Sequence, residues 1–251
     1  MSNKNKPGRF KIIITKAAAA FLVLAVLGAG GFWLYVKTQT RPAEADYLAM
    51  IMADESVSII EERNHFIIRP ANIRQDRPPV IYYPGGLVAP EAYLYKMGRT
   101  AACLQTNIYI IKAPFNAAIF DVNAAGRIID KYDLEKTWVG GHSLGGISAC
   151  RFTAGNPENV FGLFIFGSYC DQYIGEFEGP VISVMGLQDG VINRENYRDA
   201  KLNLPLNAAI LEFEGLNHFD FGNYGLQDND GPSSLGDDEV IEIICNVFRT
   251  N

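Results

Sequence analysis

The sequence contains 251 residues, of which 48% are hydrophobic, 20% are charged and 12% are aromatic. This composition excludes a disordered chain, a collagen-like repeat and a small disulfide scaffold, and it leaves enough apolar residues for a sizeable core. The formal net charge of −6, with an isoelectric point near 5.1, argues against a nucleic-acid-binding protein.

The charge is distributed unevenly along the chain. Residues 1–45 carry seven basic residues and one acidic residue, a net charge of +6, whereas residues 46–251 carry 15 basic and 27 acidic residues, a net charge of −12. We expect the two parts to occupy different surroundings: a basic flank over residues 1–16 in the cytoplasm, and an acidic domain over residues 46–251 elsewhere.

An apolar run of 20 residues without a charge, residues 17–36, follows the basic flank. At about 1.5 Å per residue, a helix of this length crosses a hydrocarbon core of about 30 Å. Trp33 and Tyr35 lie at its outer end, where aromatic rings favour the membrane interface. Five basic residues precede the run and two follow it, so the positive-inside rule predicts a single-pass signal-anchor in the cell membrane, with the domain outside the cytoplasm.

A cleaved signal peptide and a buried core helix are the alternatives for this run. The apolar region of a signal peptide is usually about 7–15 residues long, which is shorter than residues 17–36. The tripeptide Ala43-Glu44-Ala45 resembles a cleavage site, but it lies several residues beyond the apolar end. We therefore favour the uncleaved anchor, followed by a short polar linker over residues 37–45.

Short β-rich runs alternate with helical patterns in residues 46–251. Residues 56–60 and 66–69 predict an early hairpin. Six further apolar runs are typical of strands buried on both faces, namely residues 80–83, 108–112, 137–139, 160–166, 181–185 and 209–213. Helical patterns lie near residues 90–104, 119–131, 144–155, 193–201 and 238–248. This alternation predicts a doubly wound, mostly parallel α/β domain, in which ligands bind beyond the carboxyl ends of the strands.

The pentapeptide Gly141-His142-Ser143-Leu144-Gly145 is a G-x-S-x-G motif between a predicted strand and a predicted helix. A serine between strand and helix needs a sharp turn that only small neighbours permit, hence the flanking glycines. The turn lifts the hydroxyl above the sheet at a helix N-terminus, whose dipole favours developing negative charge. Ser143 is therefore the predicted nucleophile, and a glycine-rich turn without chemistry is the alternative.

The base is sought among the three histidines, because a serine hydroxyl needs a neighbouring base to be nucleophilic near neutral pH. His218 lies in a loop just past the last predicted strand, where a base would overhang the carboxyl edge of the sheet. His142 is part of the turn itself, and we expect it to pack beside that turn. His65, in the early hairpin, is interpreted as an ordinary surface or edge histidine.

The acid is expected between Ser143 and His218 in the chain, at the end of another strand. Asp189 fits this position, because it lies in the loop that follows the strand predicted over residues 181–185. Asp171, which follows the preceding strand, is the alternative acid. Asp220, two residues past the predicted base, is interpreted as a solvated loop residue.

Four stretches resemble the alpha/beta-hydrolase superfamily, and within it the small dienelactone-hydrolase-like branch of the fold-5 type. They are residues 82–87, 139–146, 186–190 and 217–225. The order nucleophile, acid, base along the chain is also that of this superfamily. The resemblance implies that the backbone N–H of Leu144 forms half of an oxyanion hole. The other half is expected from Gly86, with Leu87 as the alternative.

The segment between the strands predicted over residues 160–166 and 181–185 is too short for a helical cap, so we expect a minimal fold with an open site. Tyr169, Tyr173 and Phe177 in this segment either line an acyl pocket or pack as part of a surface loop. An open site suits bulky or polymeric substrates and argues against lid-gated interfacial lipolysis. We expect a small-molecule or polymer-borne acyl substrate.

Four cysteines and an acidic loop complete the sequence features. Buried free thiols are favoured over disulfides, which would require export and whose pairing the spacing does not give. The cysteines are Cys103, Cys150, Cys170 and Cys245. Residues 228–230, with Asp237 and Asp238, hint at calcium, but a solvated loop is favoured because the glycine comes too early for an EF-hand.

These observations predict a membrane-anchored serine hydrolase that cleaves acyl esters or thioesters through an acyl-enzyme on Ser143. We expect no metal, no organic cofactor and no nucleic-acid partner. A non-catalytic binding protein on a hydrolase scaffold and an acyltransferase using the same three residues are the alternatives. The sequence does not predict the acyl-chain preference or the oligomeric state.

Overall fold

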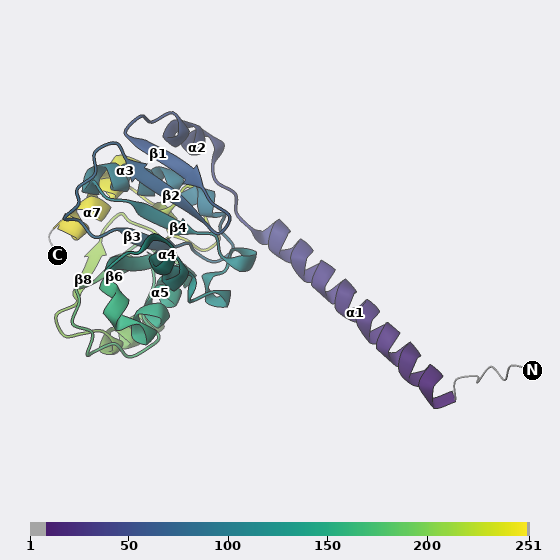
Figure 1. Ribbon diagram of the computed structural model, residues 1–251. Coiled ribbons are helices and arrows are strands. Elements are labelled where there is room, and N and C mark those ends of the chain that lie inside the picture. Colours follow the sequence, from purple (N-terminus) through teal and green to yellow (C-terminus); the bar gives the residue numbers. More distant parts are fainter. Residues whose placement is uncertain (1–8, 250–251) are drawn as a thin grey trace, which may run out of the picture. The chain divides into compact units, whose positions relative to one another are not determined.

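The computed structural model of the protein describes residues 9–249 (Figure 1). By its internal contacts the chain divides into two compact units, Met1–Thr40 and Arg41–Asn251. The boundary lies a few residues before the predicted end of the linker at residue 45. Residues 1–8, half of the predicted basic flank 1–16, lie outside the described residues.

The first unit consists of one helix, α1 (Arg9–Gln39), which contains the whole predicted apolar run. Its part from Lys16 to Gln39 has a mean hydropathy of 2.1 and is long and apolar enough to cross a membrane. This capacity to span follows from the length and composition of the helix alone, and a signal sequence shares both features.

The second unit is built on an eight-stranded sheet with the order β1-β2-β4-β3-β5-β6-β7-β8. The strand β2 pairs antiparallel with β1 and β4, and all later pairs are parallel, which confirms the predicted mostly parallel α/β fold. The strands are β1 (Val57–Glu61), β2 (His65–Pro70), β3 (Val80–Tyr83), β4 (Ile108–Ile111), β5 (Thr137–His142), β6 (Val160–Phe166), β7 (Val181–Gly186) and β8 (Ala209–Phe213).

Helices cover both faces of this sheet (Figure 1). Consecutive residues of the central strands pack alternately into two apolar clusters, as the period of two in a strand requires. One cluster includes residues of α2, α3 and α7, and the other includes residues of α4 and α5. The helices are α2 (Ala45–Met52), α3 (Leu94–Leu104), α4 (Ala124–Tyr132), α5 (Leu144–Gly155), α6 (Arg194–Ala200) and α7 (Asp237–Arg249).

The predicted elements match the structure closely, with three differences. The helix α2 was not predicted, because its eight residues directly follow the predicted linker and bury only Ile51 completely. The helical patterns near residues 90–104 and 119–131 each become a 3₁₀ turn followed by a helix, α3 and α4 respectively. The strand predicted over residues 137–139 extends to His142, because its two glycines continue the parallel pairing with β3 and β6.

The cysteines are paired, which corrects the expectation of free thiols. Cys103 of α3 is joined to Cys245 of α7, with 6.4 Å between their Cα atoms. Cys150 of α5 is joined to Cys170, just past β6, with 5.4 Å between their Cα atoms. Sequence spacing could not give this pairing, because it depends on which helices pack side by side.

His65 also differs from its expectation as a surface histidine. Its side chain is 3% exposed, and its Nε2 lies 2.9 Å from the Tyr132 hydroxyl. Burial lowers its pKa, with the nearby Lys131 charge acting in the same direction.

The two disulfides are expected to stabilise the second unit to different extents. Because the loop closed by Cys103–Cys245 spans 142 residues and that closed by Cys150–Cys170 spans 20, chain entropy alone predicts about 5 and about 3 kcal/mol, respectively. Replacing each pair by alanine and measuring urea unfolding of the oxidised protein tests this order. Wild-type protein that shows four titratable thiols after unfolding would contradict the pairing.

Candidate active site

The turn between β5 and α5 carries Ser143. This residue has φ 53° and ψ −126°, a conformation that L-residues rarely adopt and that the surroundings must hold in place. Two contacts with the end of β6 do so: the Ser143 N–H donates to the Phe166 carbonyl oxygen at 3.0 Å, and the Ser168 hydroxyl donates to the Ser143 carbonyl oxygen at 2.6 Å. Strand and helix are thereby joined with the serine at the apex.

The glycines beside Ser143 are required by a close approach to β3. A Cβ atom on Gly141 would lie 2.3 Å from the Tyr83 carbonyl oxygen, and one on Gly145 would lie 2.0 Å from the same atom. A methyl group at either position would therefore overlap backbone, which cannot move aside cheaply. The predicted need for small neighbours is thus explained by contact with β3 as well as by the turn itself.

The loop after β3 brings Gly86 to the same place. A Cβ atom on Gly86 would lie 3.0 Å from Cδ2 of Leu144, so the two predicted oxyanion residues are neighbours. The N–H of Leu87 is already engaged, because it donates to the Asn116 carbonyl oxygen at 2.7 Å, and Leu87 itself has φ 55°. Of the two residues left open by the sequence, Gly86 is therefore the better donor.

The structure brings Asp189 and His218 together. His218 Nδ1 lies 2.8 Å from Asp189 Oδ2, and both side chains are almost completely buried. The other carboxylate oxygen, Oδ1, accepts hydrogen bonds from the N–H groups of Val191 and Ile192, both at 2.9 Å. Burial opposes ionisation of Asp189, but these hydrogen bonds and the attraction to His218 hold its pKa below the ordinary value.

Ser143 directly follows His142 in the chain, and the ring centroid of His142 lies 4.4 Å from that of His218. The serine turn therefore lies beside the Asp189–His218 pair. In the described part of the chain the Ser143 hydroxyl makes no hydrogen bond to His218, a situation common before substrate binds. His142 packs beside the turn as expected, with Nδ1 3.0 Å from the Tyr93 hydroxyl. Burial, followed by the neighbouring His218, lowers the pKa of His142 well below 6.5, so this second imidazole is neutral at neutral pH.

Asp230 fixes the loop that carries His218. Its Oδ2 accepts from the Phe219 N–H at 2.9 Å, and its Oδ1 accepts from the N–H groups of His218 and Gly190 at 3.2 and 3.1 Å. One carboxylate therefore joins the loop of the acid to the loop of the base. The expectation that residues 228–230 are simply solvated is wrong for Asp230.

Lys96 of α3 also holds the loop that carries His218. Its side chain is 1% exposed, and its Nζ donates to the carbonyl oxygens of Asp220 and Gly222 at 2.5 and 3.3 Å. The charge is paired with Asp237 Oδ1 at 2.9 Å. Burial lowers the pKa of Lys96, and attraction to Asp237 partly offsets this effect.

Asp220 is buried, with 4% exposure, which corrects its interpretation as a solvated residue. Its carboxylate accepts from the Asn217 N–H at 2.8 Å, while the Asn217 side chain accepts from the Asp220 N–H at 3.0 Å. This reciprocal pair closes the turn that presents His218.

Asp171, the alternative acid, lies in an ion pair with Arg151 at 2.5 Å. The segment 167–180 between β6 and β7 contains no helix, in agreement with the absence of a helical cap. Tyr173 and Phe177 line a hollow of about 290 Å³ together with the last residues of α5. That hollow lies at the opposite end of α5 from Ser143, so these two rings are not placed to line its acyl pocket.

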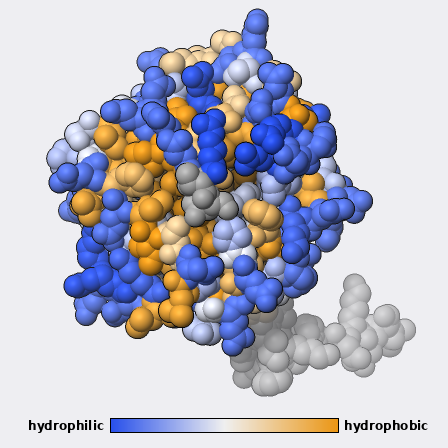
Figure 2. Space-filling model, turned by 90° about the vertical axis from the view of Figure 1, so that its left-hand side faces the viewer, coloured by the Kyte–Doolittle hydropathy of each residue, from blue (hydrophilic) through white to orange (hydrophobic). Residues whose placement is uncertain are grey.

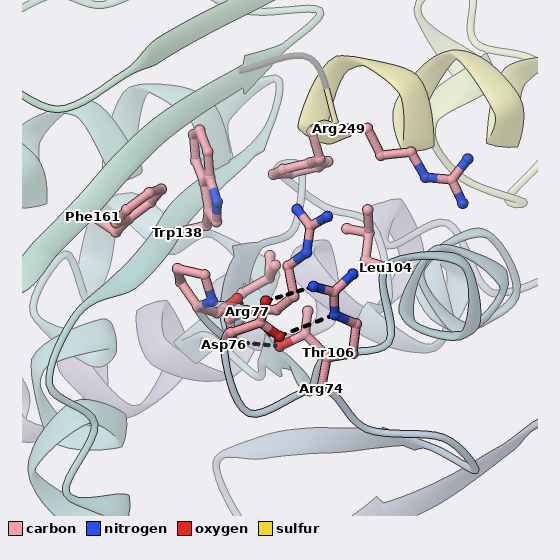
Figure 3. A pocket seen from close by; sticks show the side chains of 11 residues that line it. Arg74, Asp76, Arg77, Leu104, Thr106, Trp138, Phe161 and Arg249 are labelled. Carbon is pink, nitrogen blue, oxygen red and sulfur yellow. Dashed lines mark hydrogen bonds and ion pairs between the residues drawn. The ribbon is translucent and has the colours of Figure 1, made fainter.

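A larger cavity of about 370 Å³ lies at the amino ends of β3 and β5, the edge of the sheet opposite to Ser143. Arg74, Arg77 and Trp138 surround it in Figure 3, and Arg74 is paired with Asp76. Figure 2 shows the side of the molecule that bears the C-terminus, with hydrophobic residues gathered centrally and hydrophilic residues around them. This cavity is not the candidate catalytic site, because the Asp189–His218 pair lies at the carboxyl ends of the strands.

Lys96, Asp230 and Tyr93 are the supporting residues that sequence reasoning missed. A lysine within a helix and an aspartate within a polar tract look solvated in a sequence. Only the packing of α3, α7 and the two loops shows that Lys96 and Tyr93 are buried and that all three side chains are hydrogen-bonded.

Comparison with protein-family models gives one match, to the Alpha/beta hydrolase family over residues 79–242. The match begins just before β3 and extends into α7, so it includes Ser143, Asp189 and His218. No curated protein matches the sequence.

Solved structures with the same fold are numerous but distant in sequence. A CIB-like hydrolase from Thermoplasma acidophilum superposes with a TM-score of 0.60 at 14% identity, covering 78% of this chain and 100% of that one. Monoacylglycerol lipase from Paleococcus ferrophilus gives 0.59 at 12% identity, with 77% and 99% covered. Carboxylesterase CesB from Bacillus subtilis gives 0.51 at 13% identity, with 69% and 88% covered. At these identities the likeness concerns the fold.

The buried neutral His142 predicts a specific pH dependence of stability. Because its pKa is lowered in the folded state, the unfolded chain binds a proton that the folded chain excludes as the pH falls below 6.5. Stability is therefore complete above pH 6.5 and is lost on acidification, by up to about 1.4 kcal/mol per pH unit for one proton.

The variant His142→Gln is expected to show a correspondingly flatter dependence between pH 6.5 and 5, measured as the free energy of unfolding in urea. His65, which is present in both proteins, cancels in the comparison. Parallel profiles for the two proteins would show that His142 does not titrate in this way.

Proposed function

The chain belongs to the alpha/beta hydrolase family, and from this premise we propose that it is a membrane-anchored serine hydrolase that cleaves acyl esters or thioesters. The observation that carries the proposal is the buried Asp189–His218 pair, joined at 2.8 Å beside the turn that presents Ser143. Acyl transfer needs a nucleophile, a base and a group that orients the base, and these three residues supply one each.

In the proposed reaction the Ser143 oxygen attacks the acyl carbonyl carbon while His218 takes the serine proton. The Asp189 carboxylate orients the imidazole and stabilises the imidazolium that forms. His218 then returns the proton to the leaving alcohol or thiol, which departs and leaves the acyl group on Ser143. A water molecule, deprotonated by His218, attacks the acyl-enzyme and releases the carboxylic acid.

The negative oxygen of the tetrahedral intermediate is assigned to the N–H groups of Leu144 and Gly86. The proximity of these two residues and the engagement of the Leu87 N–H by Asn116 support this choice. Fixed donors of this kind are each worth about 10²–10³ in rate. The neutral His142 beside His218 avoids the repulsion that a second imidazolium would cause when the base is protonated.

The similar structures include a carboxylesterase and a monoacylglycerol lipase, and both names agree with acyl-ester chemistry. Export is supported by two independent features. The helix from Lys16 to Gln39 has the length and hydropathy of a membrane span, and the second unit carries two disulfides, which persist in oxidising compartments. We therefore propose a cytoplasmic N-terminus and an extracytoplasmic catalytic unit.

Labelling with a fluorophosphonate probe tests the nucleophile. Wild-type protein is expected to react and Ser143→Ala is expected not to react, because only an activated serine attacks the probe. Ser148→Ala is a matched control, since the Ser148 hydroxyl lies one turn further along α5 and donates to the Leu144 carbonyl oxygen at 3.0 Å. Equal labelling of wild type and Ser143→Ala would refute the assignment.

Substitution of the acid tests the Asp189–His218 pair. Asp189→Asn is expected to lower kcat for a short-chain ester roughly 10³–10⁴-fold, because the amide no longer stabilises the imidazolium. Asp171→Asn is the matched control and is expected to retain most activity, since Asp171 is paired with Arg151 instead. The reverse order of effects, measured by steady-state kinetics, would make Asp171 the acid.

Cell fractionation tests the anchor. The protein is expected to remain with membranes during carbonate extraction, and protease added to spheroplasts is expected to remove the catalytic unit. Release of the full-length protein by carbonate would contradict a spanning helix. Protection from protease in intact spheroplasts, with digestion after lysis, would contradict the proposed orientation.

A further inference from the structure

The four residues from Arg41 to Glu44, which we name the strap, directly follow the first unit of the chain. The strap pairs with the loop that carries Gly86. The Arg41 N–H donates to the Leu87 carbonyl oxygen at 2.8 Å, and the Ala89 N–H donates to the Arg41 carbonyl oxygen at 2.9 Å, so that Arg41 forms a parallel bridge with Val88.

The strap also pairs with the loop that follows His218. The Glu44 N–H donates to the Asn223 carbonyl oxygen at 3.0 Å, and Arg41 Nη1 donates to the Leu226 carbonyl oxygen at 2.8 Å. Two residues of the strap, Arg41 and Glu44, thus bond it to both loops of the proposed site, the one with the oxyanion donor and the one with the base.

The chain length between the anchor and the strap limits where these loops can lie. Residues 37–41 join the end of the apolar run to the first bonded residue. A fully extended chain advances at most about 3.5 Å per residue, so these five residues reach about 18 Å. This bound holds for any angle that the anchor takes, because it depends on covalent geometry alone.

Large apolar side chains are exposed near these two loops, at the carboxyl ends of the strands. Phe115 and Phe120, in the loop after β4, are 45% and 63% exposed and lie 5.9 Å apart between ring centroids. That loop is held to the oxyanion loop by the bond from the Leu87 N–H to the Asn116 carbonyl oxygen. Leu226, on the strap's other partner loop, is 68% exposed. Apolar groups gathered on both sides of a site are typical of a surface that receives an apolar ligand.

We propose that the active site opens toward the membrane surface and that its substrate is an acyl ester of a bilayer lipid. The inference rests on the proposed function, both the serine chemistry and the anchor. The strap holds the site within reach of the lipid, and the exposed aromatic rings contact the acyl chain as it leaves the bilayer. The acyl carbon–oxygen bond breaks as above, and water supplies the hydroxyl of the released acid and the proton of the released alcohol.

The experiment compares two esters with the same fluorescent leaving group, measured with the full-length protein in phosphatidylcholine nanodiscs. 4-Methylumbelliferyl oleate resides in the bilayer, whereas 4-methylumbelliferyl butyrate resides in water. A variant with a 30-residue Gly-Ser insertion between Gln39 and Thr40 keeps the strap and releases the distance bound. Because effective concentration falls roughly as the −3/2 power of tether length, lengthening the five-residue connection to 35 residues is expected to lower its oleate rate about 20-fold, with the butyrate rate unchanged.

A matched control carries the same insertion between Lys6 and Pro7, where it does not lengthen the connection to the strap. This control is expected to hydrolyse both esters at wild-type rates. An unchanged oleate-to-butyrate ratio in the Gln39–Thr40 insertion variant would overturn the proposal and favour a soluble or polymer-borne substrate. If the wild-type protein hydrolyses neither ester, the hydrolase function itself is refuted. The two failures are therefore distinguishable.

Substitution of the aromatic rim provides a second readout. Phe120→Ser is expected to lower the oleate rate severalfold more than the butyrate rate. Leu206→Ser is its matched control, because Leu206 is fully exposed but precedes β8 at the opposite edge of the sheet. Equal effects of the two substitutions on the oleate-to-butyrate ratio would count against contact between this rim and the acyl chain.

Discussion

The approach of the β5–α5 turn to the Tyr83 carbonyl oxygen is the constraint on which the rest of the site depends. With no side chain at Gly141 or Gly145, the turn lies directly against the end of β3, and Ser143 is forced into its unusual conformation. The same contact brings the loop with Gly86 beside Leu144. The proposed nucleophile and the proposed oxyanion donors are therefore positioned by backbone packing, so the proposed reaction would need no reorganisation of them.

Polar contacts then fix the two loops that carry Asp189 and His218. Asp230 bonds both loops, the buried Lys96 bonds two carbonyl oxygens beyond His218, and Asp237 compensates the lysine charge. A buried charge without its partner is costly, so Lys96 holds its neighbours in one arrangement. Loops beyond a parallel sheet are otherwise the least constrained part of such a fold, and the site needs them to be rigid.

The short chain segment between the proposed anchor and the proposed site adds a second constraint. The residues that follow the proposed anchor in the chain, Arg41 and Glu44, are the same ones that pair with both loops of the proposed site. The disulfides fit this picture, because they lie in the unit that we place outside the cytoplasm. The net charge of −6 is the sum of +6 over residues 1–45, which would orient the proposed anchor, and −12 over residues 46–251.

The sequence by itself determined the order of strands and helices, the mostly parallel α/β class and three candidate residues, because hydrophobic periodicity and the G-x-S-x-G turn are local signals. Only the tertiary structure decided the disulfide pairing, the burial of His65 and Asp220, the engagement of the Leu87 N–H by Asn116, and the contacts of Lys96, Asp230 and Arg41. Each of these depends on segments far apart in the chain that fold against one another, such as Arg41 and Leu226. No local pattern encodes such neighbours, since the same lysine or aspartate would be solvated in a different packing.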